Sequence, residues 1–223
     1  MEINWESKVL SSVSKVIPQL SCLEIDIEKL HESAINLRKE DFGINYVGNP
    51  NIVPLEYIRK TMLINTLNFV FTDFSTSVKY KIENLSDTDA MVYQINNALL
   101  EGVPLTKGSF MRDMNLEEFK RIFTGNIEMP MADEKVEILN NVGDILVTKY
   151  GGDWINFIDD GPKKLYDNGE GLVERLVRDF KRFDDYSVFE NEKVYFLKLA
   201  QLAFWGIHRE LSKRYFYIED MEN

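Results

Sequence analysis

The amino-acid sequence predicts an all-α, or nearly all-α, domain. Apolar residues recur at three- and four-residue spacing along most of the chain, as they do in amphipathic helices. Glycine, proline and capping residues separate these stretches, and only one short segment alternates as a strand does. The 223 residues are 44% apolar and 28% charged, so the chain is long enough to bury one core. We therefore expect a single helical domain over residues 1–223.

Two amphipathic helices are expected in the first part of the chain, over residues 4–17 and 23–39. In the second, the apolar side chains form one stripe opposite the charged ones. The stripe consists of Leu23, Ile27, Leu30, Ala34 and Leu37. Such a stripe is typical of a helix that packs on a core. Residues 42–54 then predict a loop, because glycine, asparagine and proline are concentrated there.

A central helix is expected to begin at Pro54, since proline suits the first turn of a helix. Its body, residues 55–71, is apolar almost all round, which predicts burial on every side. Apolar and polar residues alternate over residues 75–84, and this predicts a short strand. The apolar members of that alternation are Val78, Tyr80 and Ile82.

Capping residues mark the next two helices. Ser86 and Asp89 have the spacing of a capping box, which opens a helix that Gly102 closes. Asn115 and Glu118 have the same spacing and open a helix over residues 116–123.

Three more helices are expected toward the end of the sequence. Residues 132–152 predict a long amphipathic helix that the paired glycines at its end close, followed by a new N-cap at Asp153. We prefer this interpretation of Gly151 and Gly152 to a phosphate-binding loop. Residues 170–180 and 194–216 predict the last two helices.

Charge and composition exclude several classes of function. The net charge is −11, from 37 acidic and 26 basic residues, which disfavours binding to duplex nucleic acid. A small anionic ligand is still permitted, because two or three basic groups suffice for it. Cys22 is the single cysteine, so we expect no internal disulfide and a reducing, cytoplasmic location. The first residues resemble neither a signal peptide nor an anchor, and no apolar run has the roughly 18 residues of a membrane span.

The common catalytic and metal-binding motifs give no signal. His31 and His208 do not stand at metal-ligand spacing, so we expect neither a metal nor another cofactor. No phosphate loop, dinucleotide fingerprint or nucleophile elbow is present in the sequence. Three pairs of adjacent acids are interpreted as solvated surface, because unpaired carboxylates are rarely buried. These pairs are Asp159 with Asp160, Asp184 with Asp185, and Glu219 with Asp220.

Polar residues interrupt two apolar stretches. Asn68 and Asp73 flank the end of the central helix, where Asp73 either ends the helix or belongs to a site. Lys198 lies within residues 194–207, where it is the single charged residue. On a helix it stands beside Gln201, so the two form either the polar stripe of a buried helix or part of a polar cavity.

Several segments in register resemble one family. They are "LINTLNFVF", "LLEGVPLTKGSF", "MPMADEKVEILNNVGDILVTKYGG" and "VFENEKVYFLKLAQL". In this order and spacing they resemble the queuosine salvage proteins, which are queuosine 5'-monophosphate N-glycosylases. The resemblance covers roughly residues 55–220, while the first 50 residues match weakly. Thr72 stands where many members have tryptophan, and the family's N-terminal histidine has no counterpart in "NYVGNP".

The resemblance implies a helical fold like that of DNA glycosylases. It also implies an enzyme that acts on a free nucleotide, with water as co-substrate. The family releases queuine and ribose 5-phosphate, and a carboxylate beside the anomeric carbon is expected to stabilise the charge that forms on the ribose. Lys198, in "FLKLAQ", matches the family's lysine, so we expect it in a cavity, positioning the carboxylate or contacting phosphate. The expected substrate-binding residues are Asn68, Phe71, Asp73 and Gln201.

One part of the family pattern has no match. The family's catalytic aspartate is expected in a Phe-Ala-Asp-Tyr-Arg-like segment, and the sequence stops at Asn223 before it. We prefer the interpretation that the chain is a shortened version of a longer enzyme. The alternative is a non-catalytic module that binds queuine or the nucleotide, with a partner chain supplying the carboxylate. A helical interaction domain whose apolar helices only build a core is a third hypothesis.

Overall fold

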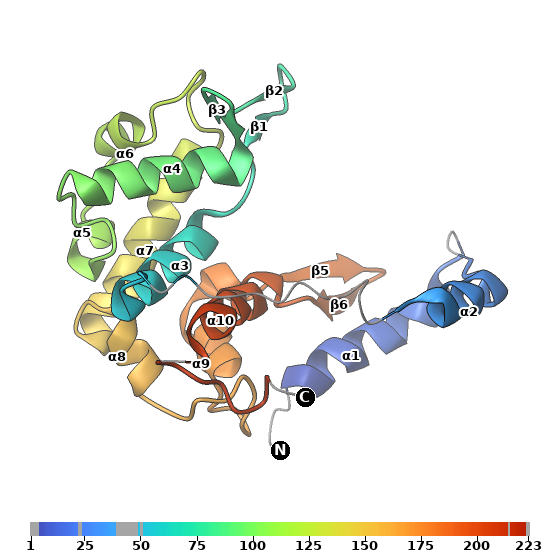
Figure 1. Cartoon of the computed structure of the whole chain (residues 1–223). Helices are drawn as coiled ribbons and strands as arrows, with labels where there is room; N and C mark the ends of the chain where they lie inside the picture. Colours follow the sequence, from blue (N-terminus) through green and yellow to red (C-terminus); the bar gives the residue numbers. More distant parts are fainter. Residues whose placement is uncertain (1–4, 22–23, 39–48, 50, 214, 222–223) are drawn as a thin grey trace.

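The computed structural model describes residues 5–21, 24–38, 49, 51–213 and 215–221, and it confirms the predominantly helical fold (Figure 1). The α-helices of this part are α1 (Trp5–Val16), α2 (Ile27–Asn36), α3 (Pro54–Leu67), α4 (Asp87–Leu100), α5 (Gly108–Arg112), α6 (Leu116–Ile122), α7 (Ala132–Tyr150), α8 (Trp154–Asp159), α9 (Leu172–Asp179) and α10 (Lys198–Leu211). Two 3-10 turns are η1 (Ile17–Gln19) and η3 (Lys181–Phe183). Across the described ranges, no helix has the length and apolarity needed to cross a membrane.

Short antiparallel strand pairs complete the described fold. They are β1 (Thr72–Asp73) with β2 (Val78–Lys79), β3 (Lys81–Ile82) with β4 (Leu85–Ser86), and β5 (Tyr186–Phe189) with β6 (Glu192–Tyr195). The strand expected over residues 75–84 is therefore two shorter strands that join different partners. Tyr80 separates them, because its side chain is fully buried and its hydroxyl donates to the carbonyl of Phe123 at 3.1 Å.

Helix α3 is central, as its apolar surface predicts. It packs against α7, α8 and α10, and Met62 and Leu63 are 0% exposed (Figure 1). Pro54 occupies its first turn, as expected. The helix ends at Leu67 rather than at residue 71, because Asn68 is already its C-cap and Val70 has a φ of 42°. Asp73 therefore does not end this helix; it lies in β1.

The predicted helix boundaries are correct at most positions. Gly102 follows α4 with a φ of 83°, and Gly151 is the C-cap of α7 with a φ of 58°. Asp153 caps α8, since its Oδ1 accepts a hydrogen bond from the backbone N–H of Ile155 at 3.0 Å. The left-handed positions of Gly102 and Gly151 suit glycine, because this backbone conformation strains a residue that has a Cβ atom.

The two capping boxes are wrong in detail. Ser86 is the N-cap of α4, but its hydroxyl lies 3.4 Å from the Asp87 carboxylate and makes no capping bond. Asn115 does cap α6, accepting from the N–H of Glu118 at 2.9 Å. The Glu118 carboxylate pairs instead with Arg121 at 3.1 Å, so it is drawn along the helix rather than back to the cap.

The expected helix over residues 194–216 begins later than predicted. Val194 and Tyr195 belong to β6, which pairs with β5 in the register Tyr186 to Tyr195. Leu197 has a φ of 51°, and Lys198 is the first residue of α10. The prediction that Lys198 lies in the middle of a helix is thus wrong, because Val194 and Tyr195, which precede it, pair with β5 as a strand.

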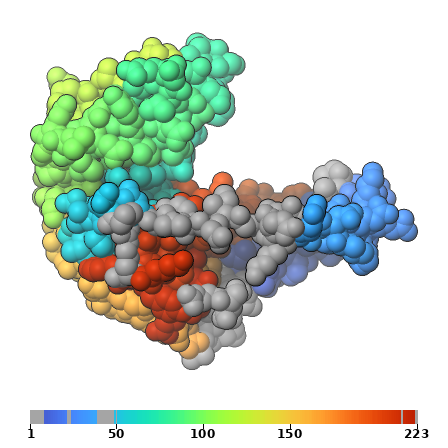
Figure 2. All heavy atoms as spheres, viewed as in Figure 1, coloured from blue at the N-terminus to red at the C-terminus, as the bar shows by residue number. Residues whose placement is uncertain are grey.

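The N-terminal helices form an arm that projects from the body (Figures 1 and 2). Helix α1 packs on β6, where the Ser12 hydroxyl accepts from the N–H of Tyr195 at 3.0 Å. Helix α2 stands clear of the body and has no buried residue; Leu30 and Ile35 are 59% and 69% exposed. The helix is predicted correctly, and the described apolar side chains of its stripe are exposed. Cys22 and Leu23 lie outside the described residues.

Candidate functional site

A hollow of about 420 Å³ forms where three segments of the chain meet. Its lining comes from the C-terminal end of α3, from η3 with the start of β5, and from the first turn of α10. The lining residues are Asn68, Phe69, Arg182, Asp184, Asp185, Tyr186, Lys198 and Leu199. The hollow thus combines two cations, two carboxylates, an amide and two aromatic rings. Its volume lies within the range of about 300–1,000 Å³ that small-molecule sites occupy.

Arg182 is held firmly at the edge of this hollow. Its Nε donates to the carbonyl of Thr66 at 2.7 Å, and its guanidinium lies 4.6 Å from the centre of the Phe69 ring. Burial lowers the pKa of Arg182 and the nearby Asp185 raises it, but a guanidinium remains charged at neutral pH. Its Nη2 is buried and has no hydrogen-bond partner among the described residues. The site therefore presents a fixed positive charge at the edge of the hollow.

The two carboxylates of the hollow differ in their bonding. Asp185 Oδ2 accepts from the backbone N–H of Lys198 at 3.3 Å, and its carbonyl accepts from the N–H of Phe196 at 2.9 Å. Asp185 thereby ties η3 to the start of α10. Asp184 Oδ1 is buried and has no partner in the described ranges. The interpretation of this pair as solvated surface is wrong for Asp184, whose Oδ1 is buried, while Asp185 is half-buried in the lining.

The other two acidic pairs differ from each other in their surroundings. Asp220 accepts from the backbone N–H groups of Leu165 and Tyr166 at 2.7 and 3.1 Å, so it is a structural carboxylate rather than a solvated one. Its neighbour Glu219 pairs with Lys164 at 3.7 Å on the surface. Asp159 is also at the surface, in an ion pair with Lys163 at 2.8 Å.

Lys198 and Asn68 are the expected site residues that the structure brings together. The Lys198 side chain is exposed and lies at the hollow, so it is neither buried nor part of a helical stripe. Asn68 Oδ1 accepts from the hydroxyl of Thr88 at 2.9 Å, which fixes its amide. Lys198 thus lies at the edge of an open hollow rather than in a buried cavity, and its role in a site stays a prediction.

The remaining expected residues do not line this hollow. Phe71 is 9% exposed in the hydrophobic core. Asp73 borders a second hollow of about 540 Å³ between β1 and the segment 127–134. Hydrogen bonds from the hydroxyl and N–H of Ser75 and from Thr76 lower its pKa, so it organises the β1–β2 turn. Gln201 donates through Nε2 to the carbonyl of Phe196 at 3.0 Å.

Sequence reasoning missed Lys135. Its side chain is 0% exposed, and its ammonium donates to the carbonyls of Phe69, Val70 and Pro130 at 2.6, 3.1 and 3.1 Å. A signal was available: Lys135 falls at helical spacing with Leu139 on the buried face of α7. If such a stripe is buried, a lysine on it needs hydrogen-bond partners.

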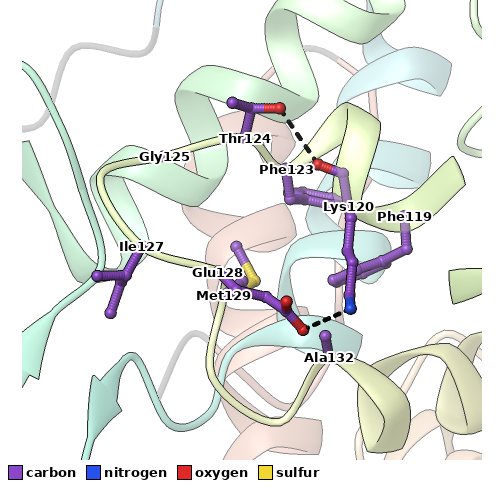
Figure 3. A pocket seen from close by; sticks show the side chains of 9 residues that line it. All are labelled: Phe119, Lys120, Phe123, Thr124, Gly125, Ile127, Glu128, Met129 and Ala132. Atoms are coloured by element: carbon purple, nitrogen blue, oxygen red, sulfur yellow. Dashed lines mark hydrogen bonds and ion pairs between the residues drawn. The ribbon is translucent and has the colours of Figure 1, made fainter. Parts of the chain in front are cut away.

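A third hollow, of about 160 Å³, lies between α6 and the start of α7 (Figure 3). Phe119, Phe123 and Met129 are among its lining residues, and Lys120 pairs with Glu128 at 2.9 Å. This volume is below that of ordinary small-molecule sites. None of the described residues form a cluster of three or more metal-ligating His, Cys, Asp or Glu side chains.

Comparison with known proteins identifies the family. The sequence model of the family described as "Queuosine salvage protein" matches residues 52–222. A queuosine 5'-phosphate N-glycosylase/hydrolase from Mus musculus is 30% identical over 181 residues, which cover 78% of this chain and 52% of the mouse protein. The protein of the same name from Bos taurus is 28% identical over 172 residues, 74% of this chain and 49% of the bovine one.

A bacterial relative is also similar. The queuosine 5'-phosphate N-glycosylase/hydrolase of Sphaerobacter thermophilus is 29% identical over 113 residues, 51% of this chain and 34% of that protein. The chain spans about half the length of the mouse and bovine relatives that it matches. Because the family model covers the whole body from α3 to α10 and leaves out the N-terminal arm, the chain belongs to the queuosine salvage protein family.

Proposed function

We propose that this chain acts on queuosine 5'-monophosphate, hydrolysing the N-glycosidic bond and releasing queuine for salvage into tRNA modification. Water adds to the anomeric carbon, the carbon–nitrogen bond breaks, and the base leaves with a proton. The products are queuine and ribose 5-phosphate. The observation that carries the proposal is a hollow with cations, carboxylates and rings in a chain of this family.

Each part of the nucleotide has a chemically suitable partner in the hollow. The 5'-phosphate needs cations, which Lys198 and Arg182 supply. The deazapurine needs a flat surface and hydrogen-bond acceptors, which the Tyr186 ring and the carboxylates of the lining offer. A carboxylate near the anomeric carbon would also stabilise the positive charge that develops on the ribose.

The net charge of −11 favours a mononucleotide over a polymer as substrate. The hollow has two cations beside two carboxylates, so it suits a ligand with few phosphates. We place the reaction in the cytoplasm, as the single cysteine of the chain suggests.

The first experiment incubates the 223-residue chain with queuosine 5'-monophosphate and follows free queuine by mass spectrometry, with nucleotide binding measured by calorimetry. We expect binding and release of queuine. Binding without release would support the alternative of a binding module that lacks its catalytic carboxylate. Neither binding nor release would contradict the proposal.

The Lys198→Met variant tests the phosphate contact. Because the side chain is exposed and its backbone N–H keeps its bond to Asp185, we expect unchanged thermal stability. Loss of a charge-assisted hydrogen bond of about 1.5–3 kcal/mol should weaken nucleotide binding roughly 10- to 100-fold. Lys213→Met, an exposed lysine of the segment after α10 that does not line the hollow, is the matched control. Equal affinities of the two variants would exclude this role for Lys198.

A further inference from the structure

The buried ammonium of Lys135 has all of its hydrogen-bonding capacity in use. An ammonium has three N–H donors, and the carbonyls of Phe69, Val70 and Pro130 accept them at 2.6, 3.1 and 3.1 Å. Leu139, one turn along the same face of α7, is 0% exposed, like Lys135 itself. Burying a cation costs free energy of folding unless the cation is fully hydrogen-bonded, so these three bonds are needed to offset the burial of Lys135.

Two of the three acceptors belong to the turn of residues 68–71, which carries Asn68 and Phe69 into the lining of the hollow. Val70 within this turn has a φ of 42°, a conformation that a β-branched residue rarely adopts. The turn is therefore strained on its own, and an external contact has to hold it. Lys135 supplies that contact from α7.

The Phe69 ring connects Lys135 to the hollow. The Lys135 ammonium lies 3.8 Å from the ring centre, and the Arg182 guanidinium lies 4.6 Å from it. Arg182 also bonds the carbonyl of Thr66, in the last turn of α3. A displacement of Phe69 would therefore move the surface on which the cation of the hollow rests.

We propose that Lys135 is a positioning residue of the hollow: its protonated side chain holds the 68–71 turn and Phe69, and through Phe69 it fixes Arg182 for the nucleotide. The role in binding rests on the function proposed above. It makes nucleotide affinity dependent on the protonation of a lysine that does not touch the ligand.

The surroundings of Lys135 bring its titration toward neutral pH. Burial, followed by repulsion from Arg182 of η3, lowers its pKa to about 7, while Glu134 of α7 acts in the opposite direction. Among the described groups, the 68–71 turn and Pro130 face the ammonium with rings and carbonyl oxygens, which favour the charged form. A neutral amine has two donors, so deprotonation leaves one carbonyl unsatisfied and removes the attraction to the Phe69 ring.

The signs of the two pH effects are opposite. Between a folded pKa of about 7 and the ordinary value of 10.5, the unfolded chain binds the proton and the folded chain does not, so rising pH stabilises the fold. Over the same rise in pH the 68–71 turn loses the charged hydrogen bonds from Lys135, so nucleotide binding weakens. A side chain with only a structural role would change stability and leave the affinity of the folded protein constant.

The test compares the intact chain with Lys135→Met and Lys135→Gln, measuring nucleotide affinity by calorimetry from about pH 6 to 9. The amide of Lys135→Gln keeps two donors, which guards against a variant that fails to fold. We expect wild-type affinity to fall roughly tenfold over this range, whereas both variants bind weakly with little added pH dependence. Lys149→Met, which removes an exposed lysine at the other end of α7, is the matched control. Variants with wild-type affinity and pH profile would overturn the proposal.

A second readout separates this inference from the proposed function. In the free chain, the NMR signals of the Phe69 ring and the Arg182 Nε–H should shift in both Lys135 variants and follow the titration of Lys135 in the wild type. Unchanged signals would overturn the positioning role even if the nucleotide binds. Shifted signals in a chain that binds no nucleotide would uphold the positioning of Phe69 and Arg182 and reject the proposed function alone.

Discussion

At the scale of single residues, Asp153 links a helix cap to an ion pair. Its carboxylate caps α8 through the N–H of Ile155, and it bonds Arg59 at 2.8 Å and Lys107 at 3.2 Å. Burial acts to raise the pKa of Asp153, but the hydrogen bonds from Arg59, Ile155 and Lys107 lower it below its ordinary value of 3.8. The charged form is thus favoured in the folded chain, and α3 is joined to α8 through it.

The Asp153→Asn variant separates the two roles, because asparagine is also a good N-cap. Loss of the partly buried ion pair should cost about 2–4 kcal/mol in the free energy of unfolding at pH 7, measured by urea titration. Since the folded pKa is depressed, the stabilisation is complete above the ordinary value of 3.8 and is lost as the pH falls through the folded value. The difference between wild type and variant should therefore shrink in acid.

Asp113→Asn is the control for this measurement, since the Asp113 side chain is 67% exposed in its pair with Arg112. Surface pairs of this kind contribute little to stability, because solvent screens them. A constant difference between wild type and Asp153→Asn down to the acid limit would argue against the ion pair as the cause. Asp153→Ala should cost more than Asp153→Asn, because alanine removes the cap as well.

At the scale of elements, the packing of α5 on α7 depends on a glycine. A Cβ atom at Gly143 of α7 would lie 2.2 Å from the backbone nitrogen of Arg112 and 2.6 Å from the carbonyl oxygen of Gly108. These are backbone atoms of α5, which cannot rotate away as a side chain can. The two helices therefore approach each other as closely as a bare backbone allows.

We expect Gly143→Ala to destabilise the fold, although alanine favours a helix by roughly 1 kcal/mol over glycine. The overlap forces α5 away from α7, and overpacking of this kind costs about 1–3 kcal/mol or more. Asp144→Ala, at the neighbouring exposed position of α7, should change the free energy of unfolding by about 0.5 kcal/mol or less. Chemical denaturation of both variants measures the effect. Unchanged or increased stability of Gly143→Ala would show that α5 does not pack as described.

At the scale of the whole molecule, the body from α3 to α10 and the N-terminal arm have different burial. The body holds nearly all of the buried apolar residues, whereas Leu30 and Ile35 of α2 are largely exposed. The candidate site lies within the body, and the family model begins at residue 52. The arm thus contributes no residue to the lining of the hollow, and the described apolar side chains of α2 are exposed.

The double variant Leu30→Ser with Ile35→Ser tests this division. Because neither side chain is buried, we expect the thermal midpoint of the body to stay the same and the binding of a hydrophobic dye to decrease. Replacing Leu63 and Ile58 of α3 by alanine is the contrast, since each large-to-small change in a core costs about 2–5 kcal/mol. A lower thermal midpoint of the arm variant would mean that α2 contributes to the stability of the body.

Most of the longer helices of the body, and several of their ends, were determined by the sequence alone, whereas the short helix α5 was not predicted. Helical spacing and the residues Pro54, Gly102, Gly151 and Asp153 act locally, so their effect is visible without knowledge of the fold. The four quoted segments in the same order also pointed to the family, which the comparisons confirm.

Tertiary structure decided which of these residues meet. Asn68 lies more than a hundred positions before Asp184 and Lys198 in the sequence. Only the packing of α3, η3 and α10 brings the three residues to one hollow. Strand pairing of β5 with β6 moved the start of α10 to Lys198, and contact with α7 made Lys135 a buried cation. Local pattern sets the helical state of a segment, but burial and hydrogen-bond partners depend on residues distant in the chain.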